Sequence, residues 1–314
     1  MNDKVKGYLL GAIAAASYGM NPLFALPLYK AGMNPDSVLF FRYLIAIPLL
    51  GVMLKWRGRD FRLKRNEVLP LVGLGLLGAF SSLTLFGSYN YMDVGIASTL
   101  LFVYPILVTL IMWLVYKERL TVQVTLCMLL ALGGIALLYQ GGNGATLSLT
   151  GVALVFVSAL SYAVYMVGIN RSVLKEMATL KVTFYVLLFG VSLFLVRLFY
   201  ADSWCVPAAD QWFLWANLLG LALFPTAVSF LCTTGAVQYI GSTPTAILGA
   251  LEPVTAVIFG VTVFGEVLTP RIFVGLLLII GAVTLVVAGG GITNHLIRFR
   301  KLFPRLTLHP RHKN

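Results

Sequence analysis

Long apolar stretches separated by short polar segments follow one another along nearly the whole chain. Each has the length of an α-helix that crosses an apolar core about 30 Å thick. They lack the strict alternation of barrel strands, so we interpret them as helices. The pattern predicts an all-α integral membrane protein with ten transmembrane helices, spans 1 to 10, roughly at 7–29, 36–54, 68–88, 95–116, 122–139, 149–169, 182–200, 211–237, 244–264 and 272–290. Span 1 is long enough to cross the membrane and leads into further spans, so we expect it to be retained rather than cleaved.

The later half of the chain repeats the earlier half. Pro105 and Pro253 are 148 positions apart, and the same offset aligns residues 87–133 with residues 235–281 without a gap. An offset of 144 aligns Ser17-Tyr18 with Ser161-Tyr162. These matches predict three parts, which are a first repeat at 1–143 with spans 1 to 5, a second repeat at 144–291 with spans 6 to 10, and a basic tail at 292–314.

Five spans in each repeat place the start of the second repeat on the opposite side of the membrane. Inverted repeats of this kind are typical of transporters, which bind substrate near the bilayer midplane where the repeats meet. We expect a central cavity lined by spans 1–4 and 6–9, with the almost purely apolar spans 5 and 10 as a brace. The alternative is a membrane scaffold or sensor that transports nothing.

Basic residues are concentrated in alternate connecting segments. With the N-terminus in the cytoplasm, the cytoplasmic segments hold 19 of the 23 Lys and Arg residues; these segments are 1–6, 55–67, 117–121, 170–181, 238–243 and 291–314. The outer segments hold two basic residues and collect acidic ones, namely Asp36, Asp93, Asp202, Asp210 and Glu266. This asymmetry predicts that both termini are cytoplasmic.

Composition excludes several classes of protein. The chain has 314 residues, of which 59% are hydrophobic and 11% charged, which leaves no room for a sizeable soluble domain. The net charge of +12 sits in short blocks that set topology, so no nucleic-acid partner is expected. Three cysteines do not make a disulfide framework. The basic tail is interpreted as an anchor near anionic headgroups, or as a partner-binding segment.

Motifs for catalysis are missing from the sequence. All three histidines lie in the tail, and no nucleophile elbow, zinc motif or P-loop occurs. We therefore expect no enzymatic activity, no cofactor and no metal site. Without a P-loop, uphill transport would depend on an ion gradient.

Two ionisable residues lie within the predicted spans and are candidates for a substrate site. Glu252 is about 12 Å deep in span 9, where a charge costs roughly 2.5–3.5 kcal/mol on insertion scales, so it must be paired, protonated or facing water. It could bind a substrate amine, carry a proton, or bond a neighbouring helix. Arg42 in span 2 could bind a carboxylate bidentately, or could pair with Glu252 or with helix-end carbonyls. Each occurs once, because the matched positions are Tyr104 and Val186.

Further candidates surround these two. Tyr18, Tyr162 and Tyr165 in spans 1 and 6 could line a cavity and stack on substrate, or serve ordinary packing. Tyr104, which matches Glu252, is also a candidate for the substrate cavity. Asn21 could bond substrate or stabilise a bend at Pro22. Pro105 and Pro253 are matched across the repeats and, with Pro22, are predicted hinges. Other matched polar residues are assigned structural roles: Asn90 and Gln238 between helices, Glu118 and Glu266 with nearby backbone, and Thr121 and Thr269 as helix caps.

Several of these motifs together resemble the EamA family of the drug/metabolite transporter superfamily. The motifs are Phe41-Arg42-Tyr43-Leu44, then Tyr104-Pro105 with Glu118-Arg119-Leu120-Thr121, and Glu252-Pro253 with Gly265-Glu266-Val267-Leu268-Thr269, besides glycines 133, 134 and 281. The resemblance covers about residues 5–290. It implies two inverted five-helix repeats around a central cavity, and export of amino acids or other small metabolites through the bacterial inner membrane.

The sequence therefore predicts a secondary transporter that works by alternating access, with one repeat rocking against the other. Its partners would be a small-molecule substrate, the lipid bilayer and possible coupling protons. The alternative is a flippase for a lipid or a lipid-linked sugar, which would need a lateral opening. The sequence does not define the substrate, the direction of transport or the oligomeric state.

Overall fold

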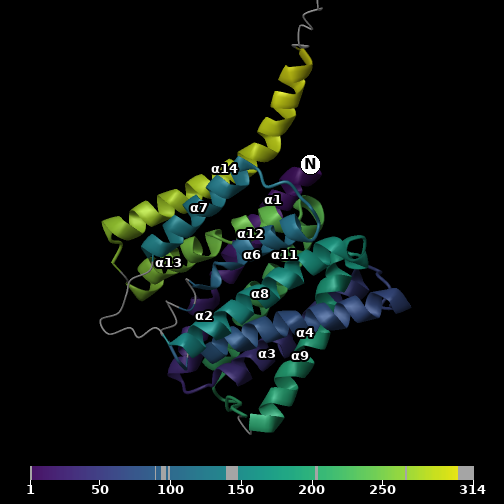
Figure 1. The fold of residues 1–314 in the computed structure, drawn as a ribbon. Helices are drawn as coiled ribbons and strands as arrows, with labels where there is room; N and C mark the ends of the chain where they lie inside the picture. The colour runs from purple at the N-terminus through teal and green to yellow at the C-terminus, as the bar shows by residue number, and fades with distance from the viewer. Residues whose placement is uncertain are drawn as a thin grey trace, which may run out of the picture.

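The fold was analysed in a computed structural model that describes residues 2–88, 90–92, 97, 100–138, 148–201, 204–265 and 267–302 (Figure 1). The expectations for Asp93, Asp202 and Glu266, for the repeat boundary at 143 and for the tail beyond 302 lie outside these residues. The described chain is helical and contains no strand. Its three cysteines are free.

The first half contains α1 (Asp3–Tyr18), α2 (Asn21–Lys30), α3 (Pro35–Trp56), α4 (Arg65–Ser88), α6 (Tyr104–Leu114) and α7 (Val122–Leu138). The second half contains α8 (Leu149–Arg171), a 3-10 turn (Val173–Lys175), α9 (Thr179–Ala201), α10 (Trp212–Leu221), a π-helical segment (Ala222–Val228), α11 (Ser229–Ile240), α12 (Ser242–Leu248), α13 (Leu251–Phe264) and α14 (Pro270–Leu302).

Eight helical segments among the described residues are long and apolar enough to cross a membrane. They correspond to predicted spans 1–3 and 6–10. Spans 4 and 5 are represented by two shorter apolar helices, α6 and α7. The all-helical membrane architecture is thus confirmed, whereas the count of ten remains a prediction.

Helix starts follow from side chains that cap the first turn. The side chain of Asn34 accepts a hydrogen bond from Ser37 N at 2.8 Å before α3. Thr121 and Thr269 accept from Val124 N and Ile272 N, both at 3.3 Å, at the starts of α7 and α14. The two threonine caps were predicted from the matched Leu-Thr pairs, and both are confirmed.

The two halves of the chain interlock. The most extensive packing joins α1 to α11, α4 to α8 and α9, α3 to α9, and α7 to α14, each pair taking one helix from each half. The α7–α14 pair lies along one side of the molecule in Figure 1. Glycines allow the close approach: a Cβ on Gly134 would lie 2.6 Å from the Gly275 carbonyl oxygen, and one on Gly75 would lie 2.7 Å from that of Val186.

Four of the predicted spans are interrupted near their middle. Span 1 breaks at Gly19 and Met20, and span 9 breaks at Gly249 and Ala250. Span 4 has a non-helical turn just before α6, and span 8 is relaxed into the π-helical segment. In each broken span the predicted hinge proline lies within the first three residues of the second helix, where its missing N–H costs nothing.

Candidate substrate cavity

Two adjoining cavities lie where the interrupted spans meet. The smaller, of about 60 Å³, is called the inner cavity and is lined from α1, α4, α6, α8, α11 and the break between α12 and α13. The larger, of about 260 Å³, is called the outer cavity and is lined chiefly from α1, α2, α3, α4 and α13. Four residues line both cavities: Tyr18, Leu85, Leu101 and Glu252.

The break in span 9 places Glu252 at this junction. Helix α12 ends at Leu248, and Glu252 lies in the first turn of α13, with its N–H donating to Gly249 O at 2.9 Å. The break in span 1 touches the same point, because a Cβ on Gly19 would lie 2.4 Å from the Glu252 carbonyl oxygen. A glycine at 19 is therefore required for the two breaks to meet.

Span 4 reaches the same break through Tyr104. Its hydroxyl donates to Ala246 O at 3.1 Å, and Tyr104 is buried. A Cβ on Gly249 would lie only 1.7 Å from the Tyr104 hydroxyl oxygen, so the side chain occupies the space that glycine leaves. The matched residues Tyr104 and Glu252 thus come together from the two halves of the chain.

Aromatic rings form one wall of the inner cavity. Tyr104 and Tyr162 pack edge to face with ring centroids 5.0 Å apart, and Tyr162 stacks on Tyr165 at 5.9 Å. Phe230 follows at 6.4 Å from Tyr165. Tyr165 is 1% exposed, and its buried hydroxyl has no hydrogen bond within the described part of the chain. The four tyrosine candidates all line this cavity: Tyr18, Tyr104, Tyr162 and Tyr165.

Arg42 is 2% exposed and supports the irregular part of span 8. Pro225 has no N–H for the Leu221 carbonyl, and the Thr226 hydroxyl donates to that carbonyl at 2.9 Å. Arg42 Nε in turn donates to the Thr226 hydroxyl at 2.9 Å, and its Nη2 donates to Pro225 O at 3.4 Å.

The third nitrogen of Arg42 reaches span 1. Its Nη1 donates to Asn21 Oδ1 at 3.4 Å, at the start of α2. The guanidinium carbon also lies 5.8 Å from the centroid of the Tyr18 ring. Among the described residues no ion pair joins Arg42 to Glu252, although both line the outer cavity. Two of the three contacts of Arg42 are thus to side chains, and one is to a backbone carbonyl within the π-helical segment.

Two sequence-based expectations need correction. Span 7 was expected to line the cavity, but no α9 residue lines either cavity, because α9 packs behind α3 and α4.

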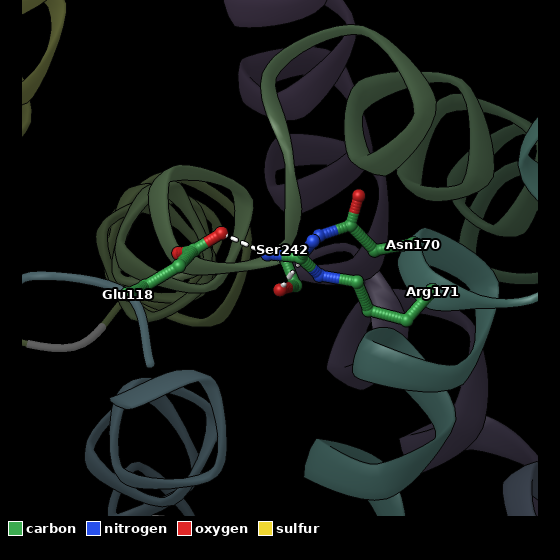
Figure 2. A network of polar contacts seen from close by, with 4 residues as sticks. All are labelled: Glu118, Asn170, Arg171 and Ser242. Atoms are coloured by element: carbon green, nitrogen blue, oxygen red, sulfur yellow. Dashed lines mark hydrogen bonds and ion pairs between the residues drawn. The ribbon is translucent and has the colours of Figure 1, made fainter. Parts of the chain in front are cut away.

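Glu118 was expected to bond nearby backbone, but its carboxylate pairs with the Arg171 guanidinium, 53 positions away (Figure 2). In the same view Asn170, beside Arg171 on α8, donates to the Ser242 hydroxyl at 3.4 Å.

Several lining residues were not selected from the sequence. Phe230 and Tyr29 are aromatic residues in apolar helices, and the sequence does not distinguish an aromatic residue that lines a cavity from one that packs against lipid or another helix. Serine and threonine lining residues could have been found as polar interruptions of the spans; these are Ser81, Ser82, Ser229, Thr233 and Thr245. No group of three or more potential metal ligands occurs in the described part of the chain.

Known proteins share both the sequence pattern and the fold. An uncharacterized transporter of Bacillus subtilis, YvbV, is 28% identical over 295 residues, which cover 90% of this chain and 92% of that protein. An uncharacterized transporter of Archaeoglobus fulgidus is 28% identical over 245 residues, covering 78% and 82%. A crystal structure of a protein with 18% sequence identity, covering 89% of this chain and 95% of its own, has a TM-score of 0.76, which shows a shared fold. The pattern of the EamA-like transporter family matches residues 5–140 and 149–288, and the chain therefore belongs to that family.

Proposed function

We propose that this protein is a secondary transporter that exports small polar metabolites, such as amino acids, across the bacterial inner membrane by alternating access. The observation that carries the proposal is the position of Glu252. A carboxylate lies at the point where broken helices from both halves meet and where two cavities join. Transporters commonly build a substrate site from discontinuous helices, whose ends place free backbone polar groups and partial charges near the middle of the membrane.

The packing indicates which helices would move together. A whole repeat cannot rock as one body, since the strongest contacts of α1 and α4 are to helices of the other half. Two mixed groups fit better: spans 1, 8 and 9 on one side of the inner cavity, and spans 3, 4 and 6 on the other. We propose that the cavity opens as these groups tilt, with the breaks near Pro22, Pro105 and Pro253 as hinges.

Contacts at the helix ends support the predicted topology with both termini in the cytoplasm. Lys6 Nζ donates to the Tyr239 hydroxyl at 2.7 Å, and Glu118 pairs with Arg171. Each contact joins two segments that the predicted topology assigns to the cytoplasmic face. In Figure 1 the N-terminus and the projecting end of α14 both lie at the top of the view.

Counterflow in liposomes tests the proposal. Purified protein is reconstituted into vesicles loaded with one unlabelled amino acid, and uptake of its labelled form is measured for a panel of amino acids and related metabolites. We expect the wild type to exchange at least one of them, and Glu252→Gln to reduce exchange more than tenfold. A Glu252→Gln protein that exchanges but no longer accumulates substrate in response to a pH gradient would identify Glu252 as the proton carrier.

A negative result is also informative. If well-folded wild-type protein moves no solute of the panel, the metabolite proposal is wrong. Scrambling of a fluorescent lipid in the same vesicles would then favour the flippase, and failure in both assays would favour a scaffold.

A further inference from the structure

Among the described residues, Glu252 is the one charged side chain that lines the inner cavity. No Lys, Arg or His occurs among the described lining residues. Arg42 borders the outer cavity, but all three of its guanidinium nitrogens have partners within the protein, as described above. The inner cavity therefore holds one carboxyl group, and the cationic side chain nearest to it among the described lining residues, Arg42, already has partners within the protein.

Hydroxyl groups strengthen this preference. Five lining hydroxyls already donate their protons to backbone carbonyls, so they offer only lone pairs to a ligand. These are Ser81 to Ser158 O, Ser82 to Gly78 O, Ser229 to Ala14 O, Thr245 to Gly241 O and Tyr104 to Ala246 O. The Tyr165 hydroxyl lies at the same wall and has no hydrogen bond within the described part of the chain, so its oxygen is a further group able to accept from a ligand N–H.

Aromatic faces complete the wall. Tyr18, Tyr104, Tyr162, Tyr165 and Phe230 surround the cavity, and the face of an aromatic ring carries partial negative charge. Rings grouped around a carboxylate form a site that attracts organic ammonium groups by cation–π contact and by charge. Carboxylate, lone pairs and ring faces all favour the same sign of ligand charge.

From this arrangement we propose that the inner cavity binds an organic ammonium group, primary or quaternary, and that it provides no partner for a substrate carboxylate. The proposal rests on the transporter function proposed above and narrows its substrate class to amine-bearing metabolites. An amine without a carboxylate is then a better ligand than the corresponding zwitterion. The ammonium lies against Tyr162 and Tyr165, with Glu252 as its counter-ion.

Two pairs of probes that differ only in the carboxylate test the proposal. Choline is compared with glycine betaine, and ethanolamine with glycine, by equilibrium binding of the labelled compounds to purified protein in detergent. We expect each cation to bind about tenfold or more tightly than its zwitterionic partner, since a carboxylate would face Glu252 with no cation to bind it. Equal or tighter binding of the zwitterions overturns the proposal.

Variants locate the site. Glu252→Gln should remove choline binding, Tyr162→Leu should weaken it about tenfold, and Tyr162→Phe, which keeps the ring, should change it less than about threefold. The control is Tyr200→Leu, which removes a 92% exposed ring at the end of α9 and should leave binding unchanged. Gel filtration and thermal unfolding verify that each variant is folded. If Tyr162→Leu does not fold, the Tyr162→Phe variant and the two pairs of probes still test the ammonium site.

The failure of this proposal can be distinguished from failure of the transporter function. If the protein exchanges amino acids in counterflow but binds neither choline nor ethanolamine, it is a transporter and the ammonium site is wrong. If it binds choline at Glu252 but exchanges no solute, the ammonium site stands and transport is wrong. Choline binding that persists in Glu252→Gln places the ligand elsewhere and overturns the proposal.

Discussion

Gln238 and Asn90 occupy matched positions in the two halves, yet their surroundings differ. Gln238, near the end of α11, donates to Leu174 O and Met177 O, both at 2.9 Å, and accepts from the Thr179 hydroxyl at 2.6 Å. Asn90 is exposed, and its side chain makes no hydrogen bond to another described residue. In the predicted inverted topology these residues would belong to opposite faces of the membrane. Gln238 connects two helical segments of the second half, whereas Asn90 makes no such connection to the described residues.

The same contrast occurs at the centre of the molecule. Glu252 in the second half is matched by Tyr104 in the first, and Arg42 in the first half is matched by Val186 in the second. The interrupted span 1 is likewise matched by the continuous helix α8. The two halves thus share the same order of helices, but each half contributes different charged and polar side chains to the centre. A symmetric fold with asymmetric contacts can give two alternative packings unequal stability, so the asymmetric contacts would set the relative populations of the two packings.

The largest effect on stability is expected when Arg42 is replaced by valine, the residue at the matched position 186 of the other half. Arg42→Val removes the donor to the Thr226 hydroxyl and to Pro225 O and leaves the π-helical segment without support. We expect a loss of roughly 3 kcal/mol or more, since hydrogen bonds from a buried charge contribute about 1.5–3 kcal/mol each. Thermal or denaturant unfolding in detergent measures the loss.

The other in-span arginine provides a matched control. Arg197 is half exposed, and its Nε lies 3.4 Å from Asp36 Oδ2. Arg197→Val should cost no more than about 1 kcal/mol, as is usual for exposed pairs. If the two valine variants are equally stable, Arg42 does not support span 8 and its role must lie with the substrate.

A smaller effect is expected where Tyr104 meets the break of span 9. Gly249→Ala forces the Tyr104 ring away from Ala246, because the new Cβ would lie 1.7 Å from the hydroxyl oxygen. Overpacking of this kind costs about 1–3 kcal/mol. The double variant Gly249→Ala with Tyr104→Ala should be more stable than the sum of the two single losses predicts. Strict additivity in unfolding measurements would show that the two sites do not touch.

The smallest effect concerns the matched helix ends. Gln238→Ala should lose about 1–2 kcal/mol and raise amide hydrogen exchange in the segment that follows α8, because the Leu174 and Met177 carbonyls lose their donor. Asn90→Ala should change stability by less than about 0.5 kcal/mol. Equal exchange in the two variants would contradict the difference between the two faces.

Helix positions could be predicted closely from the sequence, whereas polar partners could not. The span predicted at 149–169 is the helix Leu149–Arg171, because a long apolar run between polar residues specifies a spanning helix by itself. Spans 1 and 9 each contain two prolines, Pro22 with Pro27 and Pro244 with Pro253, and each of these spans is interrupted in the structure. The π-helical segment around Pro225 was not predicted, although the proline was visible, since a contact such as that from Arg42 to Pro225 O joins positions 183 apart.

The partners of the candidate residues depend on packing between distant segments. Arg42 and Thr226 are 184 positions apart, and no periodicity connects them. The internal offset predicted that Tyr104 and Glu252 are equivalent, but not that Tyr104 fills the space left by Gly249. Which helices from the two halves pair was equally beyond the sequence, because all ten apolar runs are similar in length and composition.

The interlocking of the halves also has a consequence for synthesis. The face of α1 that carries Gly7 and Gly11 closes on Ile240 and Leu248, which are more than 220 residues further along the chain. At about 5–20 residues per second, the ribosome needs roughly 10–45 s to make that distance. During this time the face of α1 has only lipid or other early helices as neighbours. A chain that stops after span 5 lacks the helices that cover α1 and α4, so we expect the first half alone not to fold stably.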